Sequence, residues 1–346
     1  MDPLAVALFM SIAAFIGIGR YVWAHRRWRN MMEAAGALLG MPVEQSWGGI
    51  GLDELRATRG EATVRLRAVR VWPLPRGDGG RRLMQRKGSD HLDLDVQLAH
   101  DPGVAFAPEP ARVVRLVMGR DLESGDVGFD EAVRLTGNAT ALRSLLDHRT
   151  RDVIRAFVAC GGRLEGRHLR LVWPHAYNVD RLVTSVEAAL AVAGRLRPSG
   201  TARARLAAIA RTDPLPAVRA RVVDFMREAH AHAAETEAAA LALLGDPDAA
   251  VRLAAARAAG DAGLEVLDAL LAEAAEPVQL GAVAALAASE AGRAVLMRRL
   301  PALAGAARAA AVTALRADAA RVGGLAVVGD AGGGLSVVER GGLSEG

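Results

Sequence analysis

The sequence predicts three structural parts in order: an N-terminal transmembrane helix, an α+β domain and an all-α helical solenoid at the C-terminal side. Three observations predict this fold class. An uncharged apolar stretch lies near the N-terminus, apolar and polar residues alternate between residues 63 and 98, and a helical motif recurs beyond residue 200. The expected parts are residues 1–29 (anchor with a basic juxtamembrane segment), 30–197 (α+β domain), 201–321 (helical repeats) and 322–346 (Gly-rich tail, flexible or strand-adding).

The N-terminal stretch Leu4–Gly19 carries no charge. Arg20 can snorkel, and the residues after it extend the apolar length to about 20 residues, enough to cross a hydrocarbon core. Positive charges follow the stretch, which by the positive-inside rule places the bulk of the chain in the cytoplasm. The residues concerned are Arg20, Arg26, Arg27 and Arg29, with Tyr21, Trp23 and Trp28 at the expected interface. The prediction is a single-pass protein of the inner (cytoplasmic) membrane.

Two alternatives compete with this anchor. A cleaved signal peptide carries its positive charges before the apolar run, whereas here they follow it. A buried helix of a soluble domain is the other alternative, and the basic residues at the end of the stretch argue against deep burial.

The region from residue 30 to 197 mixes strands and helices, in the order typical of an α+β domain. Four strands are expected, at Thr63–Trp72, His91–Leu98, Arg112–Met118 and Phe129–Leu135. Helices are then expected at Asn138–Leu146, at Thr150–Cys160 and from Asn178 to about Arg197, with Asn138 and Asn178 as N-terminal caps. A small hairpin about Gly166 is expected between the last two helices.

Beyond residue 200 a motif of Asp-Pro followed by Val-Arg recurs. Its best copy is residues 246–260, in which Asp246 is expected to cap the helix, Pro247 to occupy its first position and Gly260 to end it. Aligned on Val218, Val251, Val278 and Ala307, the copies lie 33, 27 and 29 residues apart. A period near 30, with a second apolar helix between copies, is typical of a helical solenoid.

These residues resemble the HEAT family of repeats, of the short bilin-lyase type. Residues 129–133, 145–147 and 164–171, followed by the first Asp-Pro motif, are also similar to uncharacterised bacterial proteins in which an α+β domain precedes HEAT-like repeats. Gln279 and Ala307 depart from the pattern in the last two copies. The resemblance implies an extended surface for another macromolecule, with Arg219, Arg252 and Arg257 as structural residues that tie neighbouring helices together.

Charge and cysteine content narrow the possible functions. The formal net charge is +4, and residues 201–321 hold 14 Arg against 14 acidic residues, so the repeats show no basic cluster for nucleic acid. The single cysteine, Cys160, rules out an internal disulfide. Glycine-rich phosphate loops, nucleophile elbows and zinc-protease helices are absent from the sequence. No catalytic residue, metal ligand or cofactor is therefore predicted.

His91, Asp93 and Asp95 are the strongest candidates for a chemical site, because alternating residues share one face of a strand and could present metal ligands. The favoured interpretation is the solvated face of an amphipathic strand. Other candidates are weaker: His230 and His232 diverge on a helix, Cys160 is expected to be a half-buried helix end, and the glycosylation pattern at Asn138 coincides with a helix cap.

Three functions remain open. The favoured one is a non-enzymatic, membrane-anchored scaffold that binds a protein partner through its helical repeats. The second is an enzyme whose site lies in the α+β domain, which replacement of His91, Asp93 and Asp95 by alanine would test. The third is nucleic-acid binding by the solenoid, against which the even charge balance argues. No small-molecule substrate is evident from the sequence.

Overall fold

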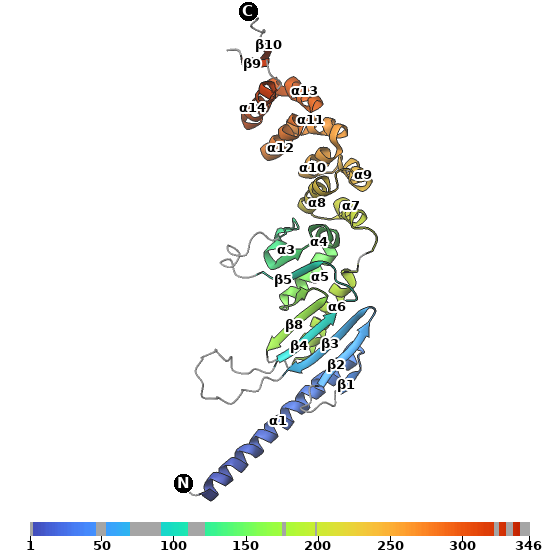
Figure 1. The fold of residues 1–346 in the computed structure, drawn as a ribbon, viewed down its shortest axis with the longest axis vertical. Helices are drawn as coiled ribbons and strands as arrows, with labels where there is room; N and C mark the ends of the chain where they lie inside the picture. The colour runs from blue at the N-terminus through green and yellow to red at the C-terminus, as the bar shows by residue number, and fades with distance from the viewer. Residues whose placement is uncertain are drawn as a thin grey trace, which may run out of the picture. The chain divides into compact units, whose positions relative to one another are not determined.

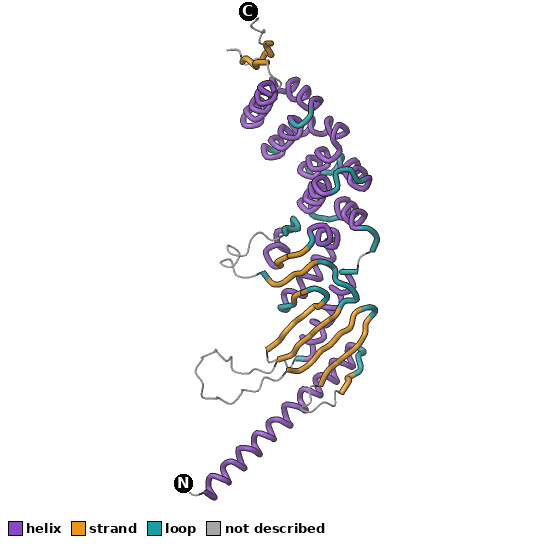
Figure 2. The backbone as a smooth tube through the Cα atoms, in the orientation of Figure 1, coloured by secondary structure: helices purple, strands orange, loops and turns teal. Residues whose placement is uncertain are grey.

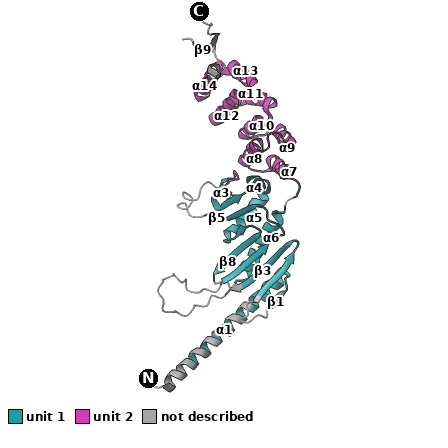
Figure 3. Cartoon of the chain, viewed as in Figure 1, with its two compact units in different colours: residues 1–123, 127–198 teal, residues 124–126, 199–346 magenta. Residues whose placement is uncertain are grey.

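A computed structural model of the chain describes residues 3–45, 53–69, 91–109, 122–174, 178–197, 199–321, 325–329 and 335–339. The chain divides into two compact units (Figure 3). Unit 1 comprises residues 1–123 and 127–198, and unit 2 comprises residues 124–126 and 199–346.

Unit 1 is built on an antiparallel sheet which, over the described residues, has eight strands in the order β1-β2-β3-β4-β8-β7-β5-β6 (Figure 1). β4 pairs with β3 and with β8 over seven residues each, whereas a single residue pair, Phe106↔Leu164, joins β5 to β7. The strands are β1 (Val43–Gln45), β2 (Asp53–Arg59), β3 (Ala62–Val69), β4 (His91–Gln97), β5 (Val104–Pro108), β6 (Val133–Gly137), β7 (Arg163–Glu165) and β8 (His168–Pro174).

Apolar side chains of one sheet face form the core of unit 1 with the helices. Along β4, residues alternate between buried and half-buried, and Leu92, Leu94 and Val96 are fully buried. Leu66 on β3 and Leu171 on β8 extend the same buried layer, as expected from the two-residue period of a strand. The helices of this unit are α1 (Pro3–Leu39), α3 (Val127–Ala132), α4 (Ala139–Leu145), α5 (His148–Ala159) and α6 (Val179–Arg195).

Three of these helices begin where the sequence provides a capping side chain. Asn138 Oδ1 accepts a hydrogen bond from the backbone N–H of Ala141 at 3.0 Å, which caps α4. Asp147 caps α5 and Asn178 caps α6 in the same way, at 2.7 and 3.1 Å. Each cap satisfies one backbone donor that has no partner inside the helix. The caps predicted at Asn138 and Asn178 are confirmed.

The transmembrane prediction is wrong. None of the helices in the described part of the chain is both long and apolar enough to cross a membrane. The stretch Leu4–Gly19 belongs to α1, one helix of 37 residues that continues through the arginines to Leu39. The last turns of α1 bury Met31, Met32 and Ala35 in the core of unit 1. The sequence argument reached the required length only by counting Arg20. The predicted anchor over residues 1–29 and the single-pass inner-membrane location are therefore wrong, and the membrane is not supported as a partner.

Other expectations for unit 1 have mixed outcomes. The strands predicted from Thr63 and His91 are confirmed as β3 and β4, and the hairpin about Gly166 as β7 and β8. The predicted strand Phe129–Leu135 is wrong in its first half, because Phe129 is a buried residue of helix α3 and the strand β6 begins only at Val133. The strand predicted at 112–118 lies outside the described residues.

Unit 2 consists mainly of helices (Figure 2). Their buried side chains form two apolar clusters. Alanine, leucine and valine dominate both clusters, as the composition predicts. The elements are α7 (Ala202–Thr212), α8 (Pro216–Ala229), α9 (Ala234–Leu243), α10 (Ala249–Ala259), the 3₁₀ helix η1 (Gly260–Gly263), α11 (Leu264–Glu273), α12 (Glu276–Ala287), α13 (Glu290–Arg299), the 3₁₀ helix η2 (Leu300–Ala302), α14 (Gly305–Arg321), β9 (Leu325–Gly329) and β10 (Leu335–Glu339). Strands β9 and β10 pair antiparallel with each other.

The repeated Asp-Pro motif lies before its helix and does not cap it. Asp248, not Asp246, caps α10 by accepting from the N–H groups of Ala250 and Val251. Asp246 instead accepts two hydrogen bonds from Arg219, at 3.0 and 2.8 Å. Gly260 has the positive φ of 59° that favours glycine, but its ψ of −126° is not left-handed helical, and η1 follows it directly.

The fold class is therefore α+β, with an antiparallel sheet followed by C-terminal helices. The predicted α+β domain agrees with this description. An all-α HEAT-like solenoid is not shown, because the copies of the motif are not equivalent: α10 ends at a glycine after 11 residues, whereas α14 continues for 17. The apolar core also divides between two clusters.

Candidate functional site

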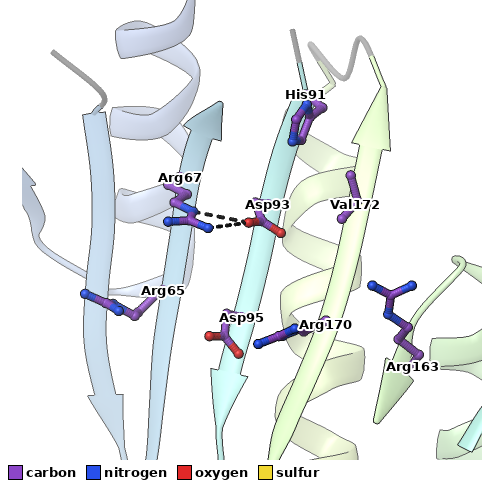
Figure 4. A pocket seen from close by; sticks show the side chains of 8 residues that line it. All are labelled: Arg65, Arg67, His91, Asp93, Asp95, Arg163, Arg170 and Val172. Atoms are coloured by element: carbon purple, nitrogen blue, oxygen red, sulfur yellow. Dashed lines mark hydrogen bonds and ion pairs between the residues drawn. The ribbon is translucent and has the colours of Figure 1, made fainter. Parts of the chain in front are cut away.

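The open face of the unit 1 sheet carries a concentrated set of charged side chains. These side chains alternate with the buried leucines, so they point away from the layer formed by the helices. They surround a depression of about 360 Å³ on β3, β4, β7 and β8 (Figure 4). The lining residues are Arg65, Arg67, His91, Asp93, Asp95, Arg163, Arg170 and Val172.

Strand register aligns charged residues across five neighbouring strands. Arg56 on β2 is opposite Arg65 on β3, which is opposite Asp95 on β4. Asp95 is opposite Arg170 on β8, and Arg170 is opposite Arg163 on β7. We call these five residues the arginine row. The row contains two pairs in which arginine directly faces arginine, with one aspartate between the pairs.

Two glutamates pair with arginines of the row, and their side chains are half-buried at Glu54 and exposed at Glu165. Arg163 Nε lies 3.2 Å and Arg170 Nη1 3.6 Å from the same residue, Glu165, whose side chain is 54% exposed. Within the part of the chain that the structure describes, Arg65 donates its Nε to Glu54 at 3.0 Å. Exposed ion pairs of this kind contribute about 0–1 kcal/mol each, so they hold the guanidinium groups only weakly.

Arg67 and Asp93 form the closest ion pair of the depression. Nε and Nη2 of Arg67 donate to the same oxygen of Asp93, at 3.2 and 2.8 Å (Figure 4). The two residues are register partners on β3 and β4, where opposite charges stabilise a sheet.

Asp95 interacts with a histidine that the sequence analysis did not single out. Nδ1 of His168 lies 2.9 and 3.2 Å from the two oxygens of Asp95. When Nδ1 carries the proton it donates to the carboxylate, which fixes the orientation of the ring. Asp95 is thus positioned at the centre of the row by His168.

The structure brings His91, Asp93 and Asp95 to one depression, as their alternation predicted. It does not bring them together as ligands: within the described ranges, no three His, Cys, Asp or Glu side chains are grouped so that they could hold a metal ion. Both aspartates instead accept hydrogen bonds from neighbouring side chains. Sequence analysis missed Arg163, His168 and Arg170. Their alternation with Leu169 and Leu171 was the available signal, but only strand register shows which residues they face.

The other singled-out residues are not among those that line this depression. Cys160 is half-buried at the C-terminal end of α5, as expected. His230 ends α8 and packs edge-on against the ring of Phe225. Arg219 and Arg252 donate to carbonyl oxygens before their own helices, which is a structural role.

A second depression, of about 280 Å³, lies among the helices of unit 2. Its walls are mostly small or apolar, from Ala256 on α10, Leu264 and Leu267 on α11, and Ala284 on α12. Two arginines, Arg227 and Arg257, also line it, and both lie within 4.0 Å of Asp224.

Comparison of the chain with protein-family models, with curated proteins and with solved structures finds no match. The resemblance to HEAT-like repeat proteins and to bacterial proteins with a preceding α+β domain therefore stays a prediction, and the function must be argued from the site itself.

Proposed function

We propose that this chain is a non-enzymatic binding protein and that the open face of its sheet binds a small anionic ligand. The observation that supports this most directly is the arginine row, in which Arg56 faces Arg65 and Arg163 faces Arg170. Like charges directly opposite each other on adjacent strands destabilise a sheet. An anion between two such guanidinium groups removes the repulsion and gains charge-assisted hydrogen bonds.

The aspartates of the depression support binding in preference to catalysis. Asp93 accepts two hydrogen bonds from Arg67, and Asp95 interacts through both oxygens with His168. A general base must reach the proton that it removes. These two carboxylates are instead directed at side chains of the sheet itself, where they position the cations around the depression.

Binding of inorganic phosphate, followed by NMR of the arginine Nε–H groups, tests the proposal. We expect saturable shifts for Arg163 and Arg170, and loss of these shifts in the double variant Arg163→Ala/Arg170→Ala. The matched control is Arg181→Ala, which removes an exposed arginine from α6, and should leave phosphate binding unchanged. Shifts that chloride at equal ionic strength reproduces, or that persist in the double variant, would refute anion binding at this face.

A second candidate function is the binding of a protein partner by the C-terminal helices. The depression among α10, α11 and α12 supports it, because its walls offer apolar contact beside two arginines. Leu280 is exposed one helical turn before Ala284 and extends the apolar surface along α12. Small apolar hollows with charged rims are common centres of protein interfaces.

Filling this depression tests the second candidate. We expect the variant Ala284→Arg to abolish capture of a specific protein that the unaltered chain retains, while the sheet-face double variant Arg163→Ala/Arg170→Ala still captures it. Equal capture by Ala284→Arg and by the unaltered chain would exclude this surface.

A further inference from the structure

We infer that the ligand of the sheet face carries two separate phosphate groups joined by a hydroxylated middle, as in a sugar bisphosphate. This inference rests on the proposed anion binding and specifies the chemistry of its ligand. It follows from the order of charges along the arginine row, which is positive, positive, negative, positive, positive.

The first phosphate position lies between Arg163 and Arg170. These residues come from adjacent strands and are register partners, so their guanidinium groups can approach one anion from two sides. Arg163 directs its Nε and Arg170 its Nη1 toward Glu165, and both side chains are nearly half exposed. Their other nitrogens can donate to phosphate oxygens, which match the planar fork of a guanidinium group.

The second phosphate position lies at Arg65, on the other side of Asp95. Arg65 uses its Nε for Glu54, and the hydrogen bonds of the described residues leave its two terminal nitrogens for a ligand. Arg56, its register partner, adds a second cation from β2. Arg67, also on β3, lines the same depression but directs its fork at Asp93.

Asp95 separates these two positions and defines the middle of the ligand. A carboxylate repels a continuous run of phosphate groups, but it has about four lone-pair sites, so Asp95 can accept hydrogen bonds from ligand hydroxyl groups in addition to the one from His168. Two strand spacings separate Arg65 from Arg170, and the positions shared with Arg56 and Arg163 add up to one more, which places the two phosphate groups about 10–14 Å apart. A neutral, hydroxylated segment of that length therefore fits between them.

The size and lining of the depression favour a small molecule over nucleic acid. A volume of about 360 Å³ lies within the range of small-ligand sites. Among the described residues that line it there is no Phe, Tyr or Trp, the side chains on which bases of single-stranded nucleic acid stack.

Calorimetric titration with fructose 1,6-bisphosphate as the probe tests the inference, with fructose 6-phosphate and inorganic phosphate as comparisons. Because two linked contacts act together, we expect the bisphosphate to bind at least about tenfold more tightly than the monophosphate. Hexane-1,6-diol bisphosphate, which has the same two phosphates without the hydroxyl groups, should bind more weakly than the sugar bisphosphate because it offers Asp95 no donor.

Single variants distinguish the two positions. Arg65→Ala should reduce the affinity for the bisphosphate to that for the monophosphate and leave monophosphate binding intact, because the position at Arg163 and Arg170 remains. Arg163→Ala should weaken both ligands. Arg181→Ala, outside the face, should change neither. These variants should change the thermal midpoint of the free protein only slightly, since Arg65→Ala and Arg163→Ala each remove one member of a repelling pair together with an ion pair that contributes about 0–1 kcal/mol.

The outcomes separate the inference from the proposal beneath it. Equal affinities for bisphosphate and monophosphate, both lost in Arg163→Ala/Arg170→Ala, would overturn the two-phosphate inference and retain anion binding. Absence of binding by all probes would overturn both. Bisphosphate binding that survives Arg65→Ala unchanged would show that the second position lies elsewhere.

Discussion

Replacing Arg219 by alanine would leave Asp246 as a buried carboxylate without its cation. Both side chains are almost fully buried, with 11% and 6% of their surface exposed. Arg219 donates through Nε and Nη2 to the two oxygens of Asp246 and through Nη1 to the carbonyl oxygen of Asp213 at 2.9 Å. Removing one member of such a pair costs about 3–5 kcal/mol, because the remaining charge stays desolvated. We expect Arg219→Ala to lower the free energy of unfolding of unit 2 by that amount.

The distribution of aromatic residues allows the two units to be followed separately. All five tryptophans and both tyrosines precede residue 199, so intrinsic fluorescence reports on unit 1, whereas circular dichroism at the helical band also reports on unit 2. With a urea dependence of about 2 kcal/mol per molar, the unfolding midpoint of unit 2 should fall by about 2 M. The fluorescence transition should not change.

Arg252→Ala provides the matched control. Arg252 holds the equivalent place in the next copy of the motif and donates from Nη1 to the carbonyl oxygens of Asp246 and Pro247, at 2.8 and 3.1 Å. Because it leaves no buried charge behind, its loss should cost only about 1–2 kcal/mol. The reasoning is refuted if Arg219→Ala costs no more than Arg252→Ala. Joint replacement by Arg219→Met and Asp246→Leu should restore most of the lost stability, since apolar pairs often replace buried ion pairs without penalty.

Three further predictions concern acid stability, a tight turn and the sheet core. The hydrogen bonds from Arg299, both 2.6 Å, lower the pKa of the Asp268 carboxyl in the folded protein. This pair therefore stabilises the fold fully above about pH 4, and the stabilisation is lost as the pH falls through the lowered pKa of the folded state. Asp268→Asn should make the urea midpoint fall less steeply as the pH is lowered. Gly137 has a φ of 125°, and an added Cβ would lie 2.6 Å from the carbonyl oxygen of Gly103. Gly137→Ala should therefore lower the free energy of unfolding, measured by fluorescence, by at least about 1–3 kcal/mol. An unchanged unfolding midpoint would contradict this expected strain. Leu94 is fully buried on β4, and Leu94→Ala should cost about 2–5 kcal/mol in the same assay, whereas a loss below 1 kcal/mol would mean that the core collapses around the change.

Patterns within a single element were predictable from the sequence. The alternation in β4 gave its buried face correctly, because a strand has a fixed two-residue period. The caps at Asn138 and Asn178 were likewise predictable, since each cap needs only a backbone donor three residues away.

Partnerships over longer distances were not predictable. Asp246 was expected to cap its helix because aspartate before proline is a common start signal, but its partner is Arg219, 27 residues earlier, and Asp248 forms the cap. Apolar length and the arginines that follow it predicted a membrane anchor from the first part of α1. The sequence did not reveal that the last turns of the same helix are buried in the core of unit 1.

The candidate site was predictable only in part. His91, Asp93 and Asp95 were recognisable as neighbours on one strand face. The arginines that face them come from β3, β7 and β8, and a shift of one residue in any of these registers would turn those arginines to the opposite face. The row of charges is therefore a product of strand pairing, which no local pattern specifies.

The single pair Phe106↔Leu164 makes the junction between β7 and β5 a weak seam in an otherwise continuous ladder. Because so few backbone hydrogen bonds join β5 to β7, the stability of this junction depends on side-chain packing. Phe106 contributes to this packing, because its ring lies edge-on against that of Phe157 on α5, with the ring centroids 6.4 Å apart. The β5–β6 edge is thus held to β7, the outermost strand of the arginine row, mainly by its buried side chains, Val104, Phe106, Val133 and Leu135.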